Sequence, residues 1–477
     1  MNKIKNFNQY FSQSKSFLTF LKSYVFAAML SMYITLFVPM IGEEGTYTIN
    51  AMELWHSKLF WNNTFGGLFY PRPPLFKILI ALVAHIIGWR HVLIASRFVT
   101  ATSIICLGFV LYWLIKNLTK EKIFAWLVVA IYFTGDLLFR RGWLSYSDPL
   151  LSFFIFTSMA CLWIAVERKN FWLLGLAVVS LLCGFLTKTL TVYMFYGVLA
   201  FWLLIFHRNR SFLLHPISWI LHLFALSFPF LWAHLTTPLY LTGMWHDLFW
   251  TQPITEGAYL YNVFLYQPVM LFVHFLPLSI PAFYYYIRRR HFELTCDYSS
   301  IAKIAFLTFT LSFLPCWFAR GQWPEARYYM PVYPMMAISM AYIVWNAPIQ
   351  LKRLIVFLLA ATLILKFLAC IYFYAYQIEF YGDDQKAARD IIQTVQDYPL
   401  YTDSDLVAPA LSITSVLDSI RWPKTPLIVP DIVNQKPKTY YVIGLHIENN
   451  GHLVKMYPIS GSPIYLSCYG DCEKEKR

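Results

Sequence analysis

Charged residues are scarce in this chain. Of its 477 residues only 13% are Asp, Glu, Lys or Arg, whereas 58% are hydrophobic and 19% aromatic. A soluble globular protein carries roughly 25% charged residues. Several apolar runs with few charges reach the roughly 20 residues that cross a bilayer. The composition therefore excludes an ordinary soluble domain and predicts an all-α polytopic membrane protein.

Other absences narrow the function. The chain has no P-loop and no Rossmann fingerprint, the motifs of nucleotide-binding proteins, and it has no internal repeat. No small-residue cleavage site follows its first apolar run, so we expect that run to be an uncleaved signal-anchor. The net charge of +13 falls largely in short loops between apolar segments, where it sets orientation. Nucleic acid is therefore excluded as a partner, and membrane lipids are expected.

We predict about eleven transmembrane helices. They lie near residues 17–41, 92–116, 123–139, 149–166, 171–187, 189–206, 212–234, 260–287, 301–319, 329–346 and 353–376. The apolar segment 74–88 is short for a crossing and contains Lys77 and His85. It is predicted as an interfacial or half-inserted helix in the first outer loop, with a tilted crossing as the alternative.

Basic residues gather in alternate loops. The loops that share the side of the N-terminus are 116–122, 167–169, 207–210, 288–290 and 352–353. The positive-inside rule makes that side cytoplasmic. We therefore expect an inner (plasma) membrane protein with a cytoplasmic N-terminus. Its remaining loops and its C-terminal domain would be periplasmic or extracellular.

The last hundred residues are polar. Residues 384–397 carry apolar side chains at helical spacing, and 439–445 and 463–466 are β-rich. We predict two domains: a transmembrane catalytic domain, 1–376, and a small extramembrane α/β domain, 377–477. In an oxidising compartment Cys468 and Cys472 can form a disulfide, with free thiols as the alternative; their spacing also permits a metal site, but no companion Cys-His cluster is evident.

Acidic and basic side chains collect in the predicted outer loops. Glu43 and Glu44 follow the first span, and a carboxylate at that depth can act as a general base. Lys188 lies at a tight turn between two apolar runs, where an ammonium needs an anion or water, and a lipid phosphate is one candidate. The alternatives are a solvated acidic loop for the glutamates, snorkelling for Lys188 and helix capping for Asp148.

These residues fall in motifs that resemble the GT-C type membrane glycosyltransferases, in particular the protein mannosyltransferase and lipid A aminoarabinose transferase group. The first-span acid motif appears here as Glu-Glu-Gly-Thr-Tyr, and the basic-Pro-Pro-Leu element as Arg-Pro-Pro-Leu. The matching segments are residues 43–47, 72–75, 95–98, 147–151, 184–189 and 326–331. Their order and their common predicted face make the set specific.

The resemblance implies an inverting transfer of a sugar from a polyprenyl-phosphate donor to a lipid, glycan or protein acceptor on the outer face. It implies Glu43 as base, with Glu44 and Asp148 orienting the acceptor or sugar. The implied ligands of the donor phosphate are Arg72, Lys188 and Arg327. An acid that helps hold a metal in the aminoarabinose enzymes is Pro71 here, so we predict no metal ligands and no required cofactor, with a divalent metal as the open alternative.

A transporter or flippase of a lipid-linked or anionic solute is the alternative function. Transporters usually place polar groups near the midplane, on broken helices in two related halves. In this chain the polar groups collect at one predicted surface and no repeat is visible. A non-catalytic scaffold would leave the clustered acids and bases unexplained. The sequence therefore favours the enzyme.

Overall fold

The computed structural model describes residues 15–57, 63–65, 68–69, 73–188, 190–236, 265–288, 298–312, 326–403, 408–433, 437–447, 450–459 and 461–472. The chain forms two compact units. The helical unit comprises residues 1–33, 101–143 and 147–368, and the mixed unit comprises 34–100, 144–146 and 369–477. The domain boundary expected at residue 376 stays a prediction.

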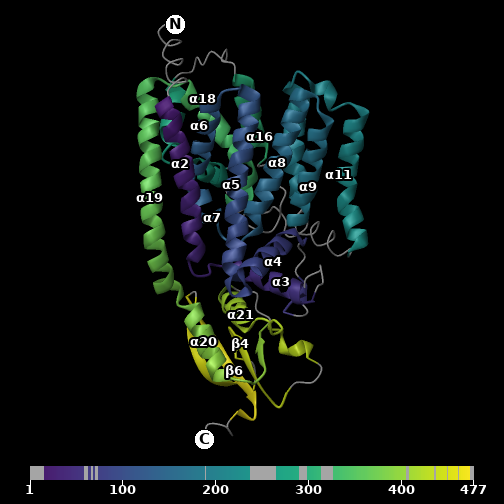
Figure 1. The fold of residues 1–477 in the computed structure, drawn as a ribbon, viewed down its shortest axis with the longest axis vertical. Helices are drawn as coiled ribbons and strands as arrows, with labels where there is room; N and C mark the ends of the chain where they lie inside the picture. The colour runs from purple at the N-terminus through teal and green to yellow at the C-terminus, as the bar shows by residue number, and fades with distance from the viewer. Residues whose placement is uncertain are drawn as a thin grey trace. The chain divides into compact units, whose positions relative to one another are not determined.

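The helical unit consists of helices, most of them long and apolar. Two of them, α5 and α19, belong in part to the mixed unit (Figure 1). In chain order they are α2 (Lys15–Ile34), α5 (Val92–Thr119), α6 (Lys122–Thr134), α7 (Asp136–Arg141), α8 (Ser147–Arg168), α9 (Phe171–Thr187), α10 (Thr191–Phe206), α11 (Pro216–Leu235), α14 (Gln267–Val273), α15 (Ser279–Arg288), α16 (Ser299–Leu311), α18 (Tyr333–Trp345) and α19 (Ile349–Tyr381). A 3-10 segment, η5 (Ala326–Val332), precedes α18.

Within the described residues, five apolar stretches have the length and composition to cross a membrane. They are Lys15–Phe37, Trp89–Thr119, Ser147–Arg168, Pro216–Leu235 and Ile349–Gln377. Shorter apolar helices, among them α6, α9, α10 and α16, lie between them in the chain. The predicted class, a mainly helical membrane protein with a small C-terminal sheet, is confirmed at this level. The number of spans stays a prediction.

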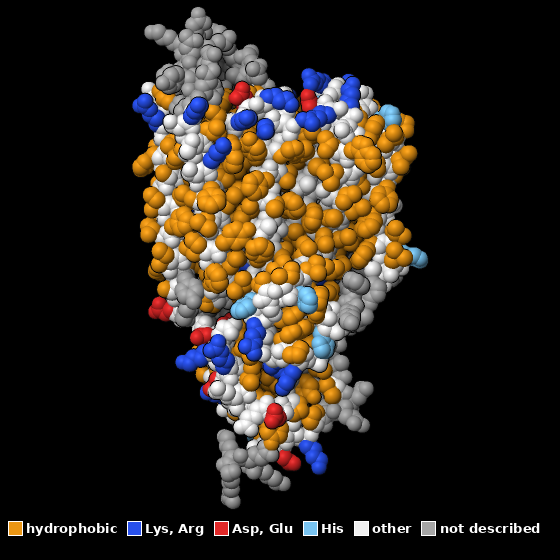
Figure 2. Space-filling model, viewed as in Figure 1, with side chains coloured by type: hydrophobic (Ala, Val, Ile, Leu, Met, Phe, Trp, Pro, Cys, Tyr) orange, Lys and Arg blue, Asp and Glu red, His pale blue; other side chains and the backbone are white. Residues whose placement is uncertain are grey.

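Helices α8 and α9 form an antiparallel hairpin. Asn170 caps α9 by accepting a hydrogen bond from the Leu173 backbone N–H at 3.1 Å. At this end of the hairpin Arg168 donates to Asn117, and Glu167 binds His207 at 3.0 Å. Three predicted basic loops therefore meet at one end of the helices. Figure 2 shows Lys and Arg side chains gathered at that end and hydrophobic side chains along the helices.

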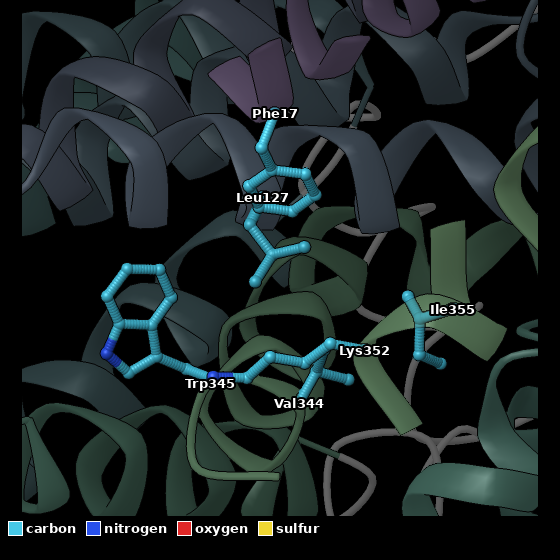
Figure 3. A pocket seen from close by; sticks show the side chains of 6 residues that line it. All are labelled: Phe17, Leu127, Val344, Trp345, Lys352 and Ile355. Carbon is cyan, nitrogen blue, oxygen red and sulfur yellow. The ribbon is translucent and has the colours of Figure 1, made fainter. Parts of the chain in front are cut away.

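A pocket among helices α2, α6, α18 and α19 has apolar walls (Figure 3). Its lining residues are Phe17, Leu127, Val344, Trp345, Lys352 and Ile355. Lys352 is the charged side chain of this lining, and its ammonium lies 5.7 Å from the Trp345 ring centroid. Because the lining contains no carboxylate, the pocket offers no general base.

The mixed unit combines the first predicted outer loop with the C-terminal part of the chain. The loop contributes α3 (Glu44–Ser57), α4 (Leu75–Ile87), η2 (Trp89–His91) and a small hairpin, β1 (Asn63–Thr64) with β2 (Leu68–Phe69). The C-terminal part contributes α20 (Asp384–Val395), α21 (Ala408–Arg421), β3 (Leu400–Thr402), β4 (Thr439–Gly444), β5 (His452–Ile459) and β6 (Ser462–Gly470). The four strands have the order β3-β4-β6-β5, with only the β3–β4 pair parallel.

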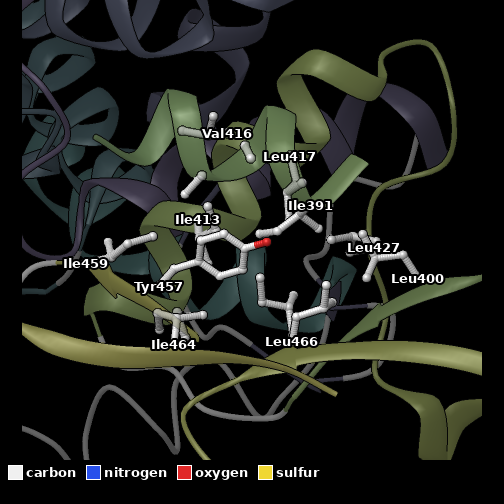
Figure 4. Close-up of a cluster of buried hydrophobic side chains, with 14 of the residues drawn as sticks. Ile391, Leu400, Ile413, Val416, Leu417, Leu427, Tyr457, Ile459, Ile464 and Leu466 are labelled. Carbon is white, nitrogen blue, oxygen red and sulfur yellow. The ribbon is translucent and has the colours of Figure 1, made fainter. Parts of the chain in front are cut away.

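Helices α20 and α21 cover the sheet and enclose its hydrophobic core. Ile391, Ile413 and Leu417 of the helices pack with Ile464 and Leu466 of β6 (Figure 4). The predicted helix in this segment and the two predicted β-rich stretches are thus confirmed as α20, β4 and β6. Of the alternatives for the last two cysteines, the structure has the disulfide, Cys468–Cys472.

Asp418 makes the stability of the mixed unit dependent on pH. Its side chain is buried, and Oδ1 accepts a hydrogen bond from the Leu427 N–H at 2.8 Å. Burial raises the pKa of Asp418 to about 7. The folded state therefore binds a proton that the unfolded state releases near pH 4, so stability is highest at low pH and falls as the pH rises to about 7.

Asp418→Asn should remove most of this slope. The amide keeps an oxygen for Leu427 and carries no charge, so the variant should exceed the wild type at pH 8 by on the order of 2 kcal/mol and match it near pH 4. Thermal unfolding in detergent from pH 4 to 8 is the measurement. Exposed Asp397→Asn is the matched control. An unchanged slope in Asp418→Asn would contradict the prediction.

Candidate active site

The predicted site residues lie in two clusters, one in each unit. Glu43 and Glu44 belong to the mixed unit, at the start of α3. Asp148, Lys188 and Arg327 belong to the helical unit, where the structure brings all three together. Each cluster is described within its own unit, and Arg72 lies outside the described residues.

Arg97 is the centre of the first cluster. Its side chain is fully buried on α5 and donates five hydrogen bonds, the number of its N–H groups. Two of them reach Glu44 side by side, Nε to Oε1 at 2.8 Å and Nη2 to Oε2 at 2.5 Å. The other three reach the backbone carbonyls of Leu36 (3.2 Å), Val38 and Pro39 (2.9 Å). The guanidinium therefore fixes the segment that leads from the first helix to α3.

The Glu44 carboxylate is equally occupied. Besides the two bonds from Arg97, Oε2 accepts from the Ile41 N–H at 2.8 Å and Oε1 from the Ser145 N–H at 2.7 Å. The side chain is 0% exposed. A carboxylate that accepts four hydrogen bonds has its lone pairs occupied and has no free acceptor site for a substrate. Its predicted role in orienting a substrate stays a prediction, while its contacts are those of a structural clamp.

Glu43 has the opposite environment. Its side chain is exposed, while its backbone is fixed by two contacts. The Glu43 N–H donates to the Tyr146 hydroxyl at 3.4 Å, and its carbonyl accepts from the Thr46 N–H at 3.1 Å. Gly42, with φ +60°, makes the turn before it, and a Cβ there would stand 2.8 Å from the Tyr146 oxygen. The Glu43 carboxylate is thus exposed on a backbone that is held in place.

The second cluster joins three charges and a ring, and we call it the Asp148 cluster. The Lys188 ammonium donates to Asp148 Oδ1, and Arg327 Nε lies 4.0 Å from Oδ2. The Tyr328 ring lies 4.6 Å from Lys188 Nζ and 5.4 Å from Arg327 Cζ, close enough for cation–π attraction. The side chains of Asp148, Lys188 and Arg327 are 3%, 11% and 12% exposed.

Local structure explains why these charges meet. Asp148 lies in the first turn of α8, and Pro149 follows it at a position where a helix tolerates proline. Lys188 is the C-cap residue of α9. Because α8 and α9 are antiparallel, these two helix ends adjoin. An anion is favoured at a helix N-terminus and a cation at a C-terminus, so the helix dipoles support the pair. Segment η5 packs on α8 and brings Arg327.

The Asp148 cluster joins one carboxylate and two cations. These side chains are largely removed from water, and electrostatic interactions are stronger there than at the surface. Two cations held this close together can bind an anionic group such as a phosphate.

No three His, Cys, Asp or Glu side chains come together as metal ligands within the described residues. In both clusters the carboxylates pair with arginine or lysine side chains.

Sequence reasoning missed several members of these clusters. The motif 95–98 contains Arg97, to which the sequence assigns no role, and the motifs likewise assign none to Ser145, Tyr146 and Tyr328. A buried arginine needs a carboxylate partner. An arginine near the start of an apolar span, such as Arg97, is therefore a signal in the sequence for a buried ion pair. The two tyrosines gave no such signal, because aromatic residues are common in this chain.

The chain is similar to known membrane glycosyltransferases. Residues 30–240 match the family described as dolichyl-phosphate-mannose-protein mannosyltransferase. The structure of ArnT from Cupriavidus metallidurans bound to undecaprenyl phosphate superposes with a TM-score of 0.67 at 12% identity, covering 94% of this chain and 97% of ArnT. The archaeal oligosaccharyltransferase AglB from Archaeoglobus fulgidus, in complex with an inhibitory peptide and a dolichol-phosphate, has a TM-score of 0.51 at 12% identity, covering 83% of this chain and 63% of AglB. No curated protein sequence matches the chain.

The fold matches that of the GT-C type membrane glycosyltransferases, and residues 30–240 match one of their families. The predicted resemblance to the protein mannosyltransferase and ArnT group is confirmed. The predicted enzyme class, a glycosyltransferase of the kind that uses polyprenyl-phosphate-linked donors, is confirmed with it.

The pairing of Glu44 with Arg97 makes a prediction about stability. Glu44→Gln leaves the Arg97 charge buried without its counter-ion, which should lower the free energy of unfolding by about 3–5 kcal/mol. The neighbouring exposed Glu43→Gln is the matched control and should change stability by less than about 0.5 kcal/mol. Chemical or thermal unfolding in detergent measures both. Equal stability of the two variants would show that the pair is not a structural clamp.

Proposed function

We propose that the protein is an inverting glycosyltransferase that moves a sugar from a polyprenyl-phosphate donor to an acceptor on the outer face of the membrane. The acceptor is a lipid, a glycan or a protein. The Asp148 cluster is the observation that carries the proposal, because it places two largely buried cations around one carboxylate. The donors of this class leave as a lipid phosphate, which needs that kind of positive site.

In the proposed reaction the cations act on the leaving group. The acceptor oxygen forms a bond to the anomeric carbon while the bond from that carbon to the phosphate oxygen breaks. The phosphate leaves with an additional negative charge, and Lys188 and Arg327 stabilise it. Asp148 holds Lys188 in place before the donor binds. We assign Arg72 to the same phosphate from its place in the motif.

The acceptor needs a base. A hydroxyl becomes a better nucleophile when a carboxylate takes its proton in the transition state. We assign Glu43 to this role, since its side chain is exposed and its backbone is fixed, while Glu44 is occupied by Arg97. The proton of the acceptor ends on Glu43 and the bonding electrons of the broken bond end on the phosphate. A metal ion has no assigned role.

We further propose the membrane arrangement predicted from the basic loops. The chain has about eleven spans, a cytoplasmic N-terminus, and its catalytic groups and C-terminal domain in the periplasm or outside the cell. The meeting of loops around Arg168, Glu167 and His207 at one helix end supports this, because Asp148 begins α8 at the opposite end.

Orientation can be measured by labelling. A single cysteine at exposed Asp397, in a background without the free cysteines, should react with a membrane-impermeant maleimide in intact spheroplasts. A cysteine at exposed Arg168 should react only after lysis. The opposite pattern would reverse the proposed sidedness.

Lys188 tests the donor site. Lys188→Ala should weaken binding of a polyprenyl-phosphate donor in nanodiscs by on the order of 2–5 kcal/mol, because the phosphate loses a partly buried counter-charge. Lys188→Arg keeps the charge and is the matched control, with a smaller loss. If the alanine variant binds donor as tightly as the wild type, Lys188 merely extends toward lipid headgroups.

Glu43 tests the base. Glu43→Gln keeps size but cannot take a proton, so sugar transfer from a synthetic polyprenyl-phosphate donor should fall about 10²- to 10⁴-fold. Donor affinity, measured in parallel, should survive. Glu43→Asp should be milder, since it retains the carboxylate. Wild-type turnover in Glu43→Gln would make Asp148 the next candidate for the base.

A further inference from the structure

The helix that carries the first-loop motif rests on a helix from the C-terminal part of the chain. Helix α3 begins one residue after Glu43 and packs on α21, more than 350 residues later in the sequence. The Thr48 and Ser415 hydroxyls are hydrogen-bonded at 2.6 Å, and both residues are buried. Thr48 also donates to the Gly45 carbonyl at 2.9 Å, so this contact reaches the first turn of α3.

Gly45 allows the two backbones to touch. A Cβ at this position would stand 2.4 Å from the Leu411 carbonyl oxygen and 2.6 Å from its carbon. Backbone atoms cannot move aside as the end of a side chain can. Any larger residue at position 45 would therefore push the start of α3 away from α21.

Helix α21 connects this contact to the sheet. Residues 409–419 are all buried. Leu411 and Ser415, four residues apart, face α3, while Ala410, Ile413 and Leu417 belong to the core shared with α20 and the sheet (Figure 4). Rigid packing on one face thus fixes the other face, on which α3 lies.

Helix α20 interacts by charge with Arg97, which holds the segment before α3. Asp384, in its first turn, is 7% exposed and interacts with the charge of Arg97. Burial raises the pKa of Asp384 to about 6, and Arg97 opposes that increase. Both C-terminal helices therefore act on the groups that surround Glu43: α21 on α3, and α20 on the arginine that holds the preceding segment.

We propose that the C-terminal domain is a positioning element for the catalytic base. It holds the start of α3, and through it the Glu43 carboxylate, at the place from which the acceptor proton is taken. The inference rests on the proposed assignment of Glu43 as base. It goes beyond that assignment by giving the C-terminal domain a part in the transfer step itself, acting through Glu43 and not on donor binding.

Gly45→Ala is the direct test. Displacement of a catalytic group by about 1 Å can cost about 100-fold in rate, so kcat should fall by about 10- to 100-fold while KM for the donor stays within about 3-fold. In the Glu43→Gln background the same substitution should change the rate by less than about 3-fold, because residues that act through one group are not additive.

A second pair of variants guards against a folding defect in Gly45→Ala. Thr48→Val removes the hydroxyl that meets Ser415 and should lower kcat in the same selective way. Thr48→Ser keeps the hydroxyl and should retain most of the rate. Exposed Asp397→Asn, in the same unit, is the matched control and should leave kcat unchanged.

The outcomes separate the two proposals. If Glu43→Gln transfers sugar at the wild-type rate, the base assignment fails, and this inference fails with it. If Glu43→Gln is impaired, but Gly45→Ala and Thr48→Val keep the wild-type kcat or lower it equally in both backgrounds, only the positioning role is overturned. A selective loss of kcat that disappears in the Glu43→Gln background supports it.

Discussion

The bond between Arg97 and Glu44 is the constraint on which the first cluster depends. Two full charges are removed from water, which is costly unless every donor and acceptor is satisfied. Here the guanidinium has five acceptors and the carboxylate four donors. Because Arg97 also binds carbonyls of the preceding segment, the pair fixes the path of the chain up to Glu43. One acid of the Glu43–Glu44 pair is thereby sealed in the structure, and the other, Glu43, is left exposed.

The Asp148 cluster is organised by helix ends. The N-terminus of α8 favours its carboxylate, and the C-terminus of the antiparallel α9 favours its ammonium, so the hairpin places opposite charges together. Arg327 adds a second cation beside the same carboxylate. The result is a largely buried cluster of two cations and one carboxylate. In the proposed reaction this cluster binds the lipid phosphate, which is already a good leaving group and requires no nucleotide.

The transporter alternative finds no support in these arrangements. Its expected signature is polar groups halfway along broken helices. In the helical unit the described charged cluster lies at helix ends. The mixed unit adds a second difference, since helix α21 of the C-terminal part of the chain packs on the loop helix α3.

The sequence by itself determined the membrane class, the resemblance to GT-C enzymes and the three charged residues of the Asp148 cluster. Apolar runs and charge bias are properties of short stretches of chain, and the motifs occur in a fixed order. These features can therefore be recognised in the sequence alone. Only the tertiary structure decided that Glu44 is sealed by Arg97 and that α3 rests on α21. Each of these depends on contacts between residues about 50 and 370 positions apart. No local pattern encodes such pairings, because they follow from how buried charges and close-packed helices satisfy one another in the folded chain.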